Sequence, residues 1–205
     1  MTRSGRGWYV PRRMRPRSLT PRLLVAVTGF ALLGACNSTI LPPATTANVV
    51  DTVTLYALNG TPLGTPSAYA ISGPLVVRTD LSASFDFAFN IDTLHRPVLV
   101  PTGVLALGVV QASTQPGFVL SSSTFADLTQ APTGGYEIDS ALVVAVGNVI
   151  IARSRGLTCS DGTTNTLYAK LHVLAISTTA RTIQFEALAD QNCGYVGLEP
   201  GLPQQ

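Results

Sequence analysis

The sequence predicts an all-β fold, an antiparallel β-sandwich, with a small β-barrel as the alternative. From residue 49 onward, short runs of β-branched and other apolar residues recur at intervals of roughly 8–12 residues, separated by Gly, Pro and Asn. Alternation of apolar and polar residues over 84–92 is typical of a strand with one buried face. Apolar residues make up 46% of the chain and charged residues 12%, which indicates a packed core rather than disorder.

The first half of this region contains six expected strands. The clearest is 84–92, which directs one set of side chains to the core and the other to solvent. The core-facing set is Phe85, Phe87, Phe89 and Ile91, and the opposite set is Ser84, Asp86, Ala88, Asn90 and Asp92. The other expected strands are 49–58, 67–71, 75–79, 96–101 and 104–110. Turn-forming residues close these runs, so neighbouring strands are expected to be antiparallel.

The second half begins with a polar stretch and continues with two expected hairpins. Residues 111–135 are rich in Ser, Thr, Gln, Gly and Pro and are expected to be largely loop. The β-branched segment 136–154 is divided by Gly147–Asn148, which predicts a hairpin turn, or a bulge in one long strand. Segments 166–177 and 181–188 are expected to form the other hairpin.

An arginine-rich segment and an apolar run open the chain. Seven of the 13 Lys and Arg residues precede residue 23, and no acidic residue does. The run 23–35 carries no charge and is shorter than the ~20 residues of a transmembrane helix. A basic segment, a short apolar run and small residues at its end are the parts of a secretory signal peptide. The sequence therefore predicts export, with Met14 as an alternative start of the leader.

The apolar run ends in Leu33, Gly34 and Ala35, followed by Cys36. This stretch resembles the lipobox of bacterial lipoproteins, in which an aliphatic residue and two small residues precede an invariant cysteine. The resemblance implies that residues 1–35 are a signal peptide and that Cys36 becomes the lipidated N-terminus of the mature protein. The membrane is then a partner through the lipid on Cys36, because two or three acyl chains anchor firmly. An ordinary signal peptide cleaved near Ala35 is the alternative.

The rest of the chain is expected to be a tether and one domain. Residues 36–48 are predicted to be the lipidated cysteine and a flexible tether, because Pro, Thr and Ala dominate without apolar periodicity. Residues 49–205 are predicted to form a single all-β domain. In some bacteria an aspartate after the lipidated cysteine retains a lipoprotein in the inner membrane. Since Asn37 stands there, the resemblance favours the outer membrane of the cell envelope over the inner one.

Removal of the leader changes both the charge and the cysteine balance. The remaining chain has six basic and eleven acidic residues, a net charge of −5, so no nucleic-acid partner is expected. With Cys36 set aside, Cys159 and Cys193 remain, and in an oxidising compartment they are expected to form a disulfide. Two buried free thiols are the alternative. The closed loop predicts a stabilisation of roughly 3–4 kcal/mol.

Few residues are candidates for chemistry. His95 and His172 are the only histidines, and either has the chemistry of a general base for a serine, yet no GxSxG motif accompanies them. Asp86, Asn90, Asp92 and His172 are candidates to face a ligand such as a cation or a sugar, with the solvated face of a strand as the simpler interpretation. Phosphate-binding glycine loops, HExxH and CxxC are absent, so no cofactor or metal is expected.

Three functions remain open, and residues 49–205 resemble no characterised family. The leading hypothesis is a lipid-anchored envelope protein whose β-sandwich is non-catalytic and serves binding, adhesion or assembly, with an envelope protein or a glycan as partner. The second is a carrier of a small apolar ligand in a cavity along Phe85, Phe87 and Phe89. The third is a secreted hydrolase that uses His95 or His172.

Overall fold

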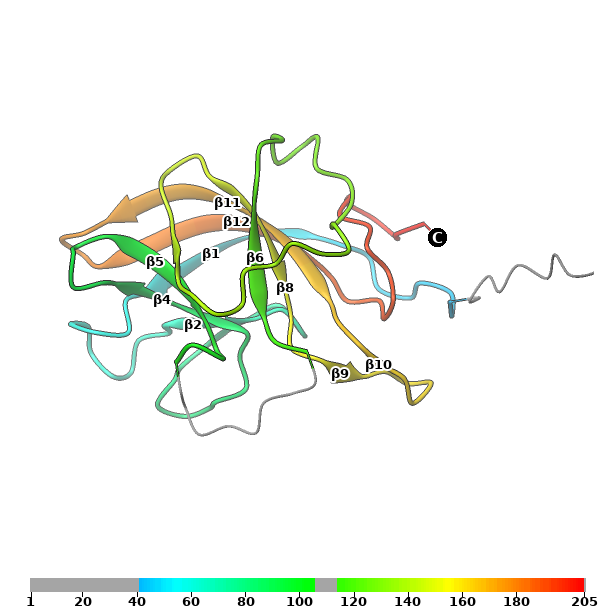
Figure 1. The fold of residues 1–205 in the computed structure, drawn as a ribbon, viewed down its shortest axis with the longest axis horizontal. Helices are drawn as coiled ribbons and strands as arrows, with labels where there is room; N and C mark the ends of the chain where they lie inside the picture. Colours follow the sequence, from blue (N-terminus) through cyan, green and yellow to red (C-terminus); the bar gives the residue numbers. More distant parts are fainter. Residues whose placement is uncertain (1–40, 106–113, 205) are drawn as a thin grey trace, which may run out of the picture. The chain divides into compact units, whose positions relative to one another are not determined.

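The computed structural model describes residues 41–105 and 114–204, which fold into two five-stranded antiparallel sheets packed face to face (Figure 1). The first sheet has the order β1-β12-β11-β8-β6, with bounds Val50–Tyr56, Thr182–Asp190, Tyr168–Ser177, Val149–Arg153 and Gly117–Ser121. The second has the order β3-β2-β4-β5-β7, with bounds Leu75–Val77, Ala68–Ala70, Phe87–Ile91, Pro97–Pro101 and Leu142–Val143. Strands β9 (Leu157–Thr158) and β10 (Thr164–Asn165) form a small ribbon. The predicted all-β antiparallel sandwich is confirmed, and its open sheets are not the alternative small barrel.

Strands β11 and β12 form the longest pairing of the first sheet, as the sequence predicts. Their register runs from Tyr168 opposite Asp190 to Ser177 opposite Thr182. A shift in register between Val173 and Ala175 interrupts the alternation of faces, which leaves Leu174 exposed.

Among the described residues, no helix is long and apolar enough to cross a membrane.

Aromatic rings fill the space between the two sheets. Phe87 of β4 lies 5.5 Å from Tyr69, 5.3 Å from Phe118 and 6.3 Å from Phe185, measured between ring centroids. Tyr69 also meets Phe185 edge to face at 5.9 Å. These four rings are almost completely buried, and each contact adds to the stabilisation that apolar burial provides. Phe89 is also buried in this core, and Phe85 is buried in a smaller cluster with Ala68 and Ala88. All three phenylalanines proposed to line a cavity are therefore packing residues.

The hairpin predicted at Gly147–Asn148 is wrong, although a turn is present. Strand β7 pairs with β5 in the second sheet, whereas β8 pairs with β6 and β11 in the first. The turn therefore connects the two sheets instead of two neighbouring strands. Its geometry is set locally, because Gly147 has φ +87° and the Asn148 side-chain oxygen accepts a hydrogen bond from the Ala145 amide. A turn motif specifies a change of direction and does not specify the pairing partner.

Two other expectations for the middle of the chain differ from the structure. In the predicted strand 104–110, residues 104 and 105 form a turn and the remainder lies outside the described residues. Strand β6 was not predicted, because its few apolar residues stand among Ser, Gln and Pro. It forms through five paired positions with β8, a long-range contact that local composition does not reveal.

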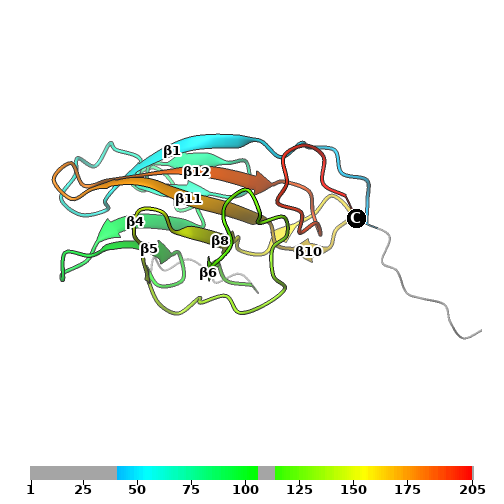
Figure 2. The ribbon, with the colours of Figure 1, turned by 90° about the horizontal axis from the view of Figure 1, so that it is seen from above.

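Residues 41–48, which we call the strap, lie against one end of the sandwich (Figure 2). The strap enters β1 directly, and Asn48 forms an antiparallel bridge with Gly201 near the other end of the chain. The turns at 92–96 and 178–181 lie at the opposite end, where β4 meets β5 and β11 meets β12 (Figure 1). We call the end that carries the strap the strap end and the other the distal end.

Candidate functional site

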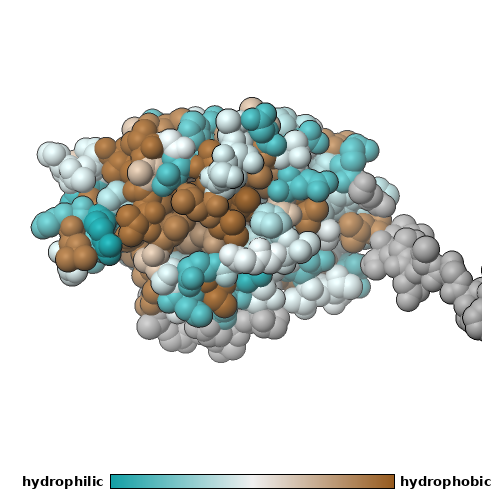
Figure 3. All heavy atoms as spheres, turned by 45° about the horizontal axis from the view of Figure 1, so that its top comes forward, coloured by the Kyte–Doolittle hydropathy of each residue, from teal (hydrophilic) through white to brown (hydrophobic). Residues whose placement is uncertain are grey.

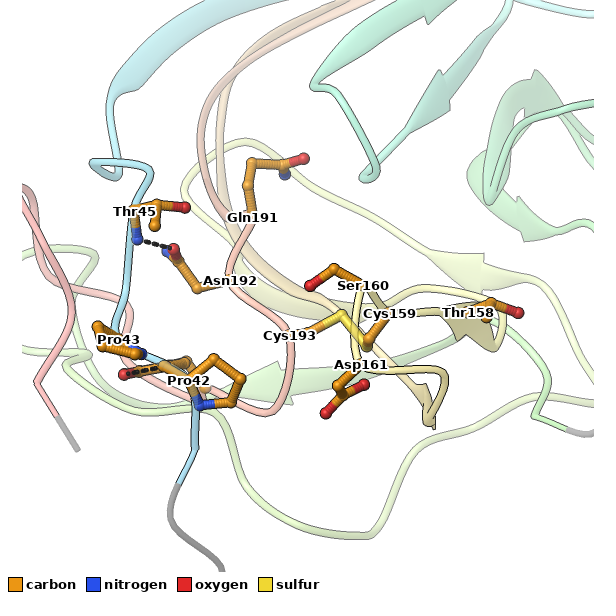
Figure 4. Close-up of a pocket in the computed structure, with 11 residues that line it drawn as sticks. Pro42, Pro43, Thr45, Thr158, Cys159, Ser160, Asp161, Gln191, Asn192 and Cys193 are labelled. Atoms are coloured by element: carbon orange, nitrogen blue, oxygen red, sulfur yellow. Dashed lines mark hydrogen bonds between the residues drawn. A yellow bond between two sulfur atoms is a disulfide. The ribbon is translucent and has the colours of Figure 1, made fainter.

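The candidate site is a cleft of about 300 Å³ at the strap end, and three separate segments line it (Figure 4). The strap contributes Pro42, Pro43 and Thr45, and the β9–β10 hairpin contributes Thr158, Cys159, Ser160 and Asp161. The segment after β12 contributes Gln191, Asn192, Cys193 and Tyr195. The cleft therefore exists only while these three segments are held together.

A disulfide joins Cys159 to Cys193 and forms the floor of this arrangement, as the sequence predicts. The two Cα atoms are 6.0 Å apart, and the residues are separated by 34 positions in the chain. The bond ties the hairpin to the segment that follows β12 (Figure 4). The ribbon β9–β10 has only two residues per strand, so this covalent link and the packing of Leu157 against the core both constrain its position.

Asn192 holds the strap in place through one side chain. Its Oδ1 accepts hydrogen bonds from the amides of Thr45 and Thr46 at 2.9 and 3.1 Å, and its Nδ2 donates to the Thr46 carbonyl at 2.8 Å. The same Nδ2 donates to Oδ1 of the buried Asp190 at 2.8 Å, which orients the amide. The Asn192 amide thus makes hydrogen bonds of the kind that a paired strand would make, because it accepts from two backbone amides and donates to one backbone carbonyl.

Tyr195 and Gly194 secure the beginning of the strap. The Tyr195 hydroxyl donates to the Pro42 carbonyl at 2.9 Å. Gly194 has φ +84°, and a Cβ atom there would lie 2.6 Å from Cδ2 of Leu41, so a larger residue would be strained in its backbone and would push the Leu41 side chain aside. Residues 36–48 were expected to be a flexible tether, but the described part of this segment, residues 41–48, is hydrogen bonded to the segment after β12. The composition of residues 36–48 does not predict these hydrogen bonds.

The cleft is chemically a polar surface site with one negative charge. Hydrogen bonds from the hydroxyl and the amide of Thr163 lower the pKa of Asp161, so this carboxylate is ionised at neutral pH. Ser160 and Thr158 add hydroxyl groups to the lining, whereas the Gln191 amide is already bonded to the backbone of Ile71 and Gly73. Among the described residues, no group of three or more His, Cys, Asp or Glu side chains could hold a metal ion. The walls offer hydrogen bonds to a small polar group.

Asp86, expected on the solvated face of its strand, is instead fully buried at 0% exposure. Its Oδ2 accepts a hydrogen bond from the Ile71 amide at 2.7 Å, and its Oδ1 accepts one from the Arg155 amide at 3.0 Å. The backbone bends at Asp86, so strand β4 begins one residue later and the predicted alternation of faces breaks at this point. Asp86 therefore ties the second sheet to the segment after β8.

Asn90 and Asp92 do not join Asp86 in a common site. The Asn90 side chain accepts a hydrogen bond from the Asn59 amide at 3.2 Å. Asp92 closes the β4–β5 turn by accepting from the amides of Leu94 and Arg96 and by pairing with the Arg96 guanidinium at 2.8 Å. Each of these polar residues thus has a separate structural partner.

His172 lies on the outer face of the first sheet, away from the cleft. Its Nδ1 is 2.7 Å from Oε1 of Glu186, which is directly opposite it in the register. The neighbouring Lys170 is buried, and its ammonium donates to the carbonyls of Phe125 and Leu128 at 2.7 and 2.9 Å. This lysine fixes the loop that covers the sheet, and its burial lowers its pKa. Sequence patterns did not single it out.

His95 lies in the exposed β4–β5 turn with φ +61°. The structure thus distributes the described candidates over four places: the cleft, the distal end, the sheet-to-segment contact at Asp86, and the outer face at His172. Cys36 lies outside the described residues. Of these candidates only Cys159 and Cys193 line the cleft. Asn192 was missed, and its position next to Cys193 in a turn-rich segment was the one available signal.

No protein-family model matches the chain, and comparisons with curated proteins and with solved structures likewise give no match.

Proposed function

We propose that this protein is a lipoprotein of the cell envelope, attached through a lipid on Cys36, with a non-catalytic β-sandwich that binds a partner at the envelope. The observation that carries the proposal is the division of the three cysteines. Cys159 and Cys193 are joined in a disulfide, a bond that persists in oxidising compartments outside the cytoplasm. Cys36 is left over at the end of a leader with a basic segment and an apolar run.

Radiolabelled palmitate is expected to be incorporated by the wild-type protein and not by Cys36→Ala when each is produced in bacteria. The reason is that the thiol of Cys36 is the proposed acceptor of the diacylglyceryl group. Ser38→Ala is the matched control, because it alters a neighbouring residue without removing a thiol, and it is expected to label like the wild type. Equal labelling of wild type and Cys36→Ala would refute the anchor.

Three features support a binding role over a hydrolytic one. Nδ1 of His172 is occupied by Glu186 rather than by a hydroxyl group. Figure 3 shows hydrophobic surface gathered on one face of the molecule. Leu120 in β6, Val143 in β7 and Val146 in the connection to β8 are large apolar side chains that remain exposed. Exposed apolar surface of this kind is typical of protein interaction sites. The acidic balance of the mature chain adds charge selectivity toward a partner.

A second candidate function is the binding of a small amphiphile with an apolar body and an anionic end. The observation that favours it is a groove of about 520 Å³ beside the edge strand β3. Leu75 and Leu81 line this groove and are 60% and 71% exposed, and Arg78 and Arg155 stand among its walls. The Arg78 guanidinium is already paired with Asp80, so Arg155 is the cation that would meet the anionic end. An apolar wall with a guanidinium nearby suits such a ligand.

The dye 8-anilinonaphthalene-1-sulfonate, which has an aromatic body and a sulfonate, is expected to bind this groove. The double variant Leu75→Asp with Leu81→Asp is expected to weaken binding about tenfold or more, because each leucine contributes on the order of 1–2 kcal/mol when covered. Fluorescence titration measures the effect, and Leu94→Asp at the distal end is the control. Unchanged affinity in the double variant would remove the groove as a ligand site.

A further inference from the structure

We propose that the strap end of the sandwich faces the membrane and rests on the lipid headgroups, so that the distal end is the part presented to partners. This inference rests on the proposed function, because it requires a lipid on Cys36. Its starting point is the amount of chain between the lipid and the first residue held by the domain. Pro42 is held through its carbonyl by Tyr195, which leaves only residues 37–41 as a spacer.

The spacer sets an upper limit on the height of the domain. Even when fully extended, the six steps from Cys36 to Pro42 span about 20 Å. If the whole segment up to Asn48 were free, the same calculation would give about 40 Å. The contacts of the strap therefore halve the reach of the tether and hold the domain close to the surface to which Cys36 is attached.

In addition to the hydrogen bond from Tyr195, two contacts keep the strap short. Asn192 binds the backbone of Thr45 and Thr46, and Leu41 lies against Gly194. The disulfide at Cys193 fixes the segment that supplies both contacts, so the strap is bound to a covalently constrained partner. Release of the strap requires the loss of several hydrogen bonds at once.

The long axis of the sandwich then determines which residues lie far from the membrane. Strand β12 runs from the distal end to the strap end and has nine residues, which corresponds to a length of about 30 Å. The turn between β4 and β5, which contains Leu94, lies at the distal end (Figure 1). Leu202 lies at the strap end, because it lines one surface hollow together with Pro43 and Ala44 of the strap. The strap end also exposes Pro43 and Leu202, apolar side chains that suit the interfacial region of a bilayer.

Single-tryptophan variants of the lipidated protein test the orientation. The mature chain contains no tryptophan, because Trp8 precedes Cys36, so Leu202→Trp and Leu94→Trp each introduce one reporter at an exposed position. The proteins are reconstituted in phosphatidylcholine vesicles that contain a lipid with a nitroxide on its headgroup. Emission of Leu202→Trp is expected to fall by about half, and emission of Leu94→Trp to stay nearly constant, because the distal end lies beyond the reach of the label.

A third protein, Leu202→Trp combined with Asn192→Ala and Gly194→Leu, releases the strap and is expected to lose most of the quenching. Circular dichroism verifies that it keeps its β structure. Quenching of Leu94→Trp as strong as that of Leu202→Trp, or no quenching of either, in a protein that carries lipid overturns the orientation alone. If mass spectrometry finds Cys36 unmodified, the proposed function fails and the orientation fails with it.

Discussion

Replacing Cys159 and Cys193 together with serine is expected to lower the free energy of unfolding by about 3–4 kcal/mol. The disulfide closes a loop with a sequence separation of 34, so its removal gives the unfolded chain more conformational freedom. The ribbon β9–β10 is too short to hold its own position, and the hydrogen bonds of Asn192 to the strap should weaken with it. Urea denaturation followed by circular dichroism measures the loss.

Ser160→Ala is the control for the disulfide variant, since it alters the same loop and keeps both cysteines. It is expected to change the stability by less than about 0.5 kcal/mol, as surface substitutions usually do. Hydrogen exchange gives a second readout, because the amides of Thr45 and Thr46 should exchange faster without the disulfide. A double-serine variant as stable as the wild type would show that the bond is dispensable for the fold.

Asp86→Ala is expected to lower the free energy of unfolding by about 3 kcal/mol, because it leaves buried backbone donors without an acceptor. Those donors are the amides of Ile71 and Arg155, which hydrogen bond to the two carboxylate oxygens. Asp86→Asn keeps one acceptor and should lose less. Asp139→Ala, which removes an exposed carboxylate, is the control and is expected to have little effect. Urea titrations of the three variants measure the differences.

The same residue makes the stability depend on pH. Burial raises the pKa of the Asp86 carboxyl, and the backbone hydrogen bonds and the charge of Arg155 oppose this only in part. A raised pKa in the folded state means that the native protein holds the proton more tightly than the unfolded chain does. The resulting stabilisation is complete below the ordinary value of about 3.9 and is lost as pH rises through the folded pKa.

The pH dependence is tested by comparing wild type with Asp86→Asn, which cannot ionise. Unfolding free energies of the wild type relative to this variant should decline as pH rises above about 4. Burial also raises the pKa of Asp190, and because both proteins retain it, its contribution cancels in the comparison. A difference that stays constant across the pH range would contradict the raised pKa of Asp86.

Much of the fold could be predicted because the apolar pattern and the turn residues agree for the long strands. Strands β1, β11 and β12 carry clear patterns, and Ala169, Leu171 and Val173 of β11, which alternate along the strand, are buried in the core. The pair Cys159 and Cys193 could be predicted once Cys36 was assigned to processing. The strands depend on local apolar patterns, and the disulfide depends on the number of cysteines. A single sequence provides both.

The failures share a different physical origin, since each depends on a contact between distant segments. Asp86 has an ordinary position in an alternating pattern, and only the approach of Ile71 and Arg155 makes it a buried acceptor. Strand β6 depends on its pairing with β8. The strap depends on the Asn192 side chain, more than 140 positions away along the chain. None of these partners can be deduced from the composition of the segment itself.

The strap also determines how the domain responds to mechanical load. Strand β1 lies at the edge of its sheet and follows the strap directly, so a pull on the N-terminal side would otherwise detach β1 from β12 one hydrogen bond at a time. Because the strap is bound to the segment after β12, and the disulfide fixes that segment, tension applied to the N-terminal side enters the fold there instead. The edge strand is shielded from peeling, and the force passes into a strand that has a neighbour on each side.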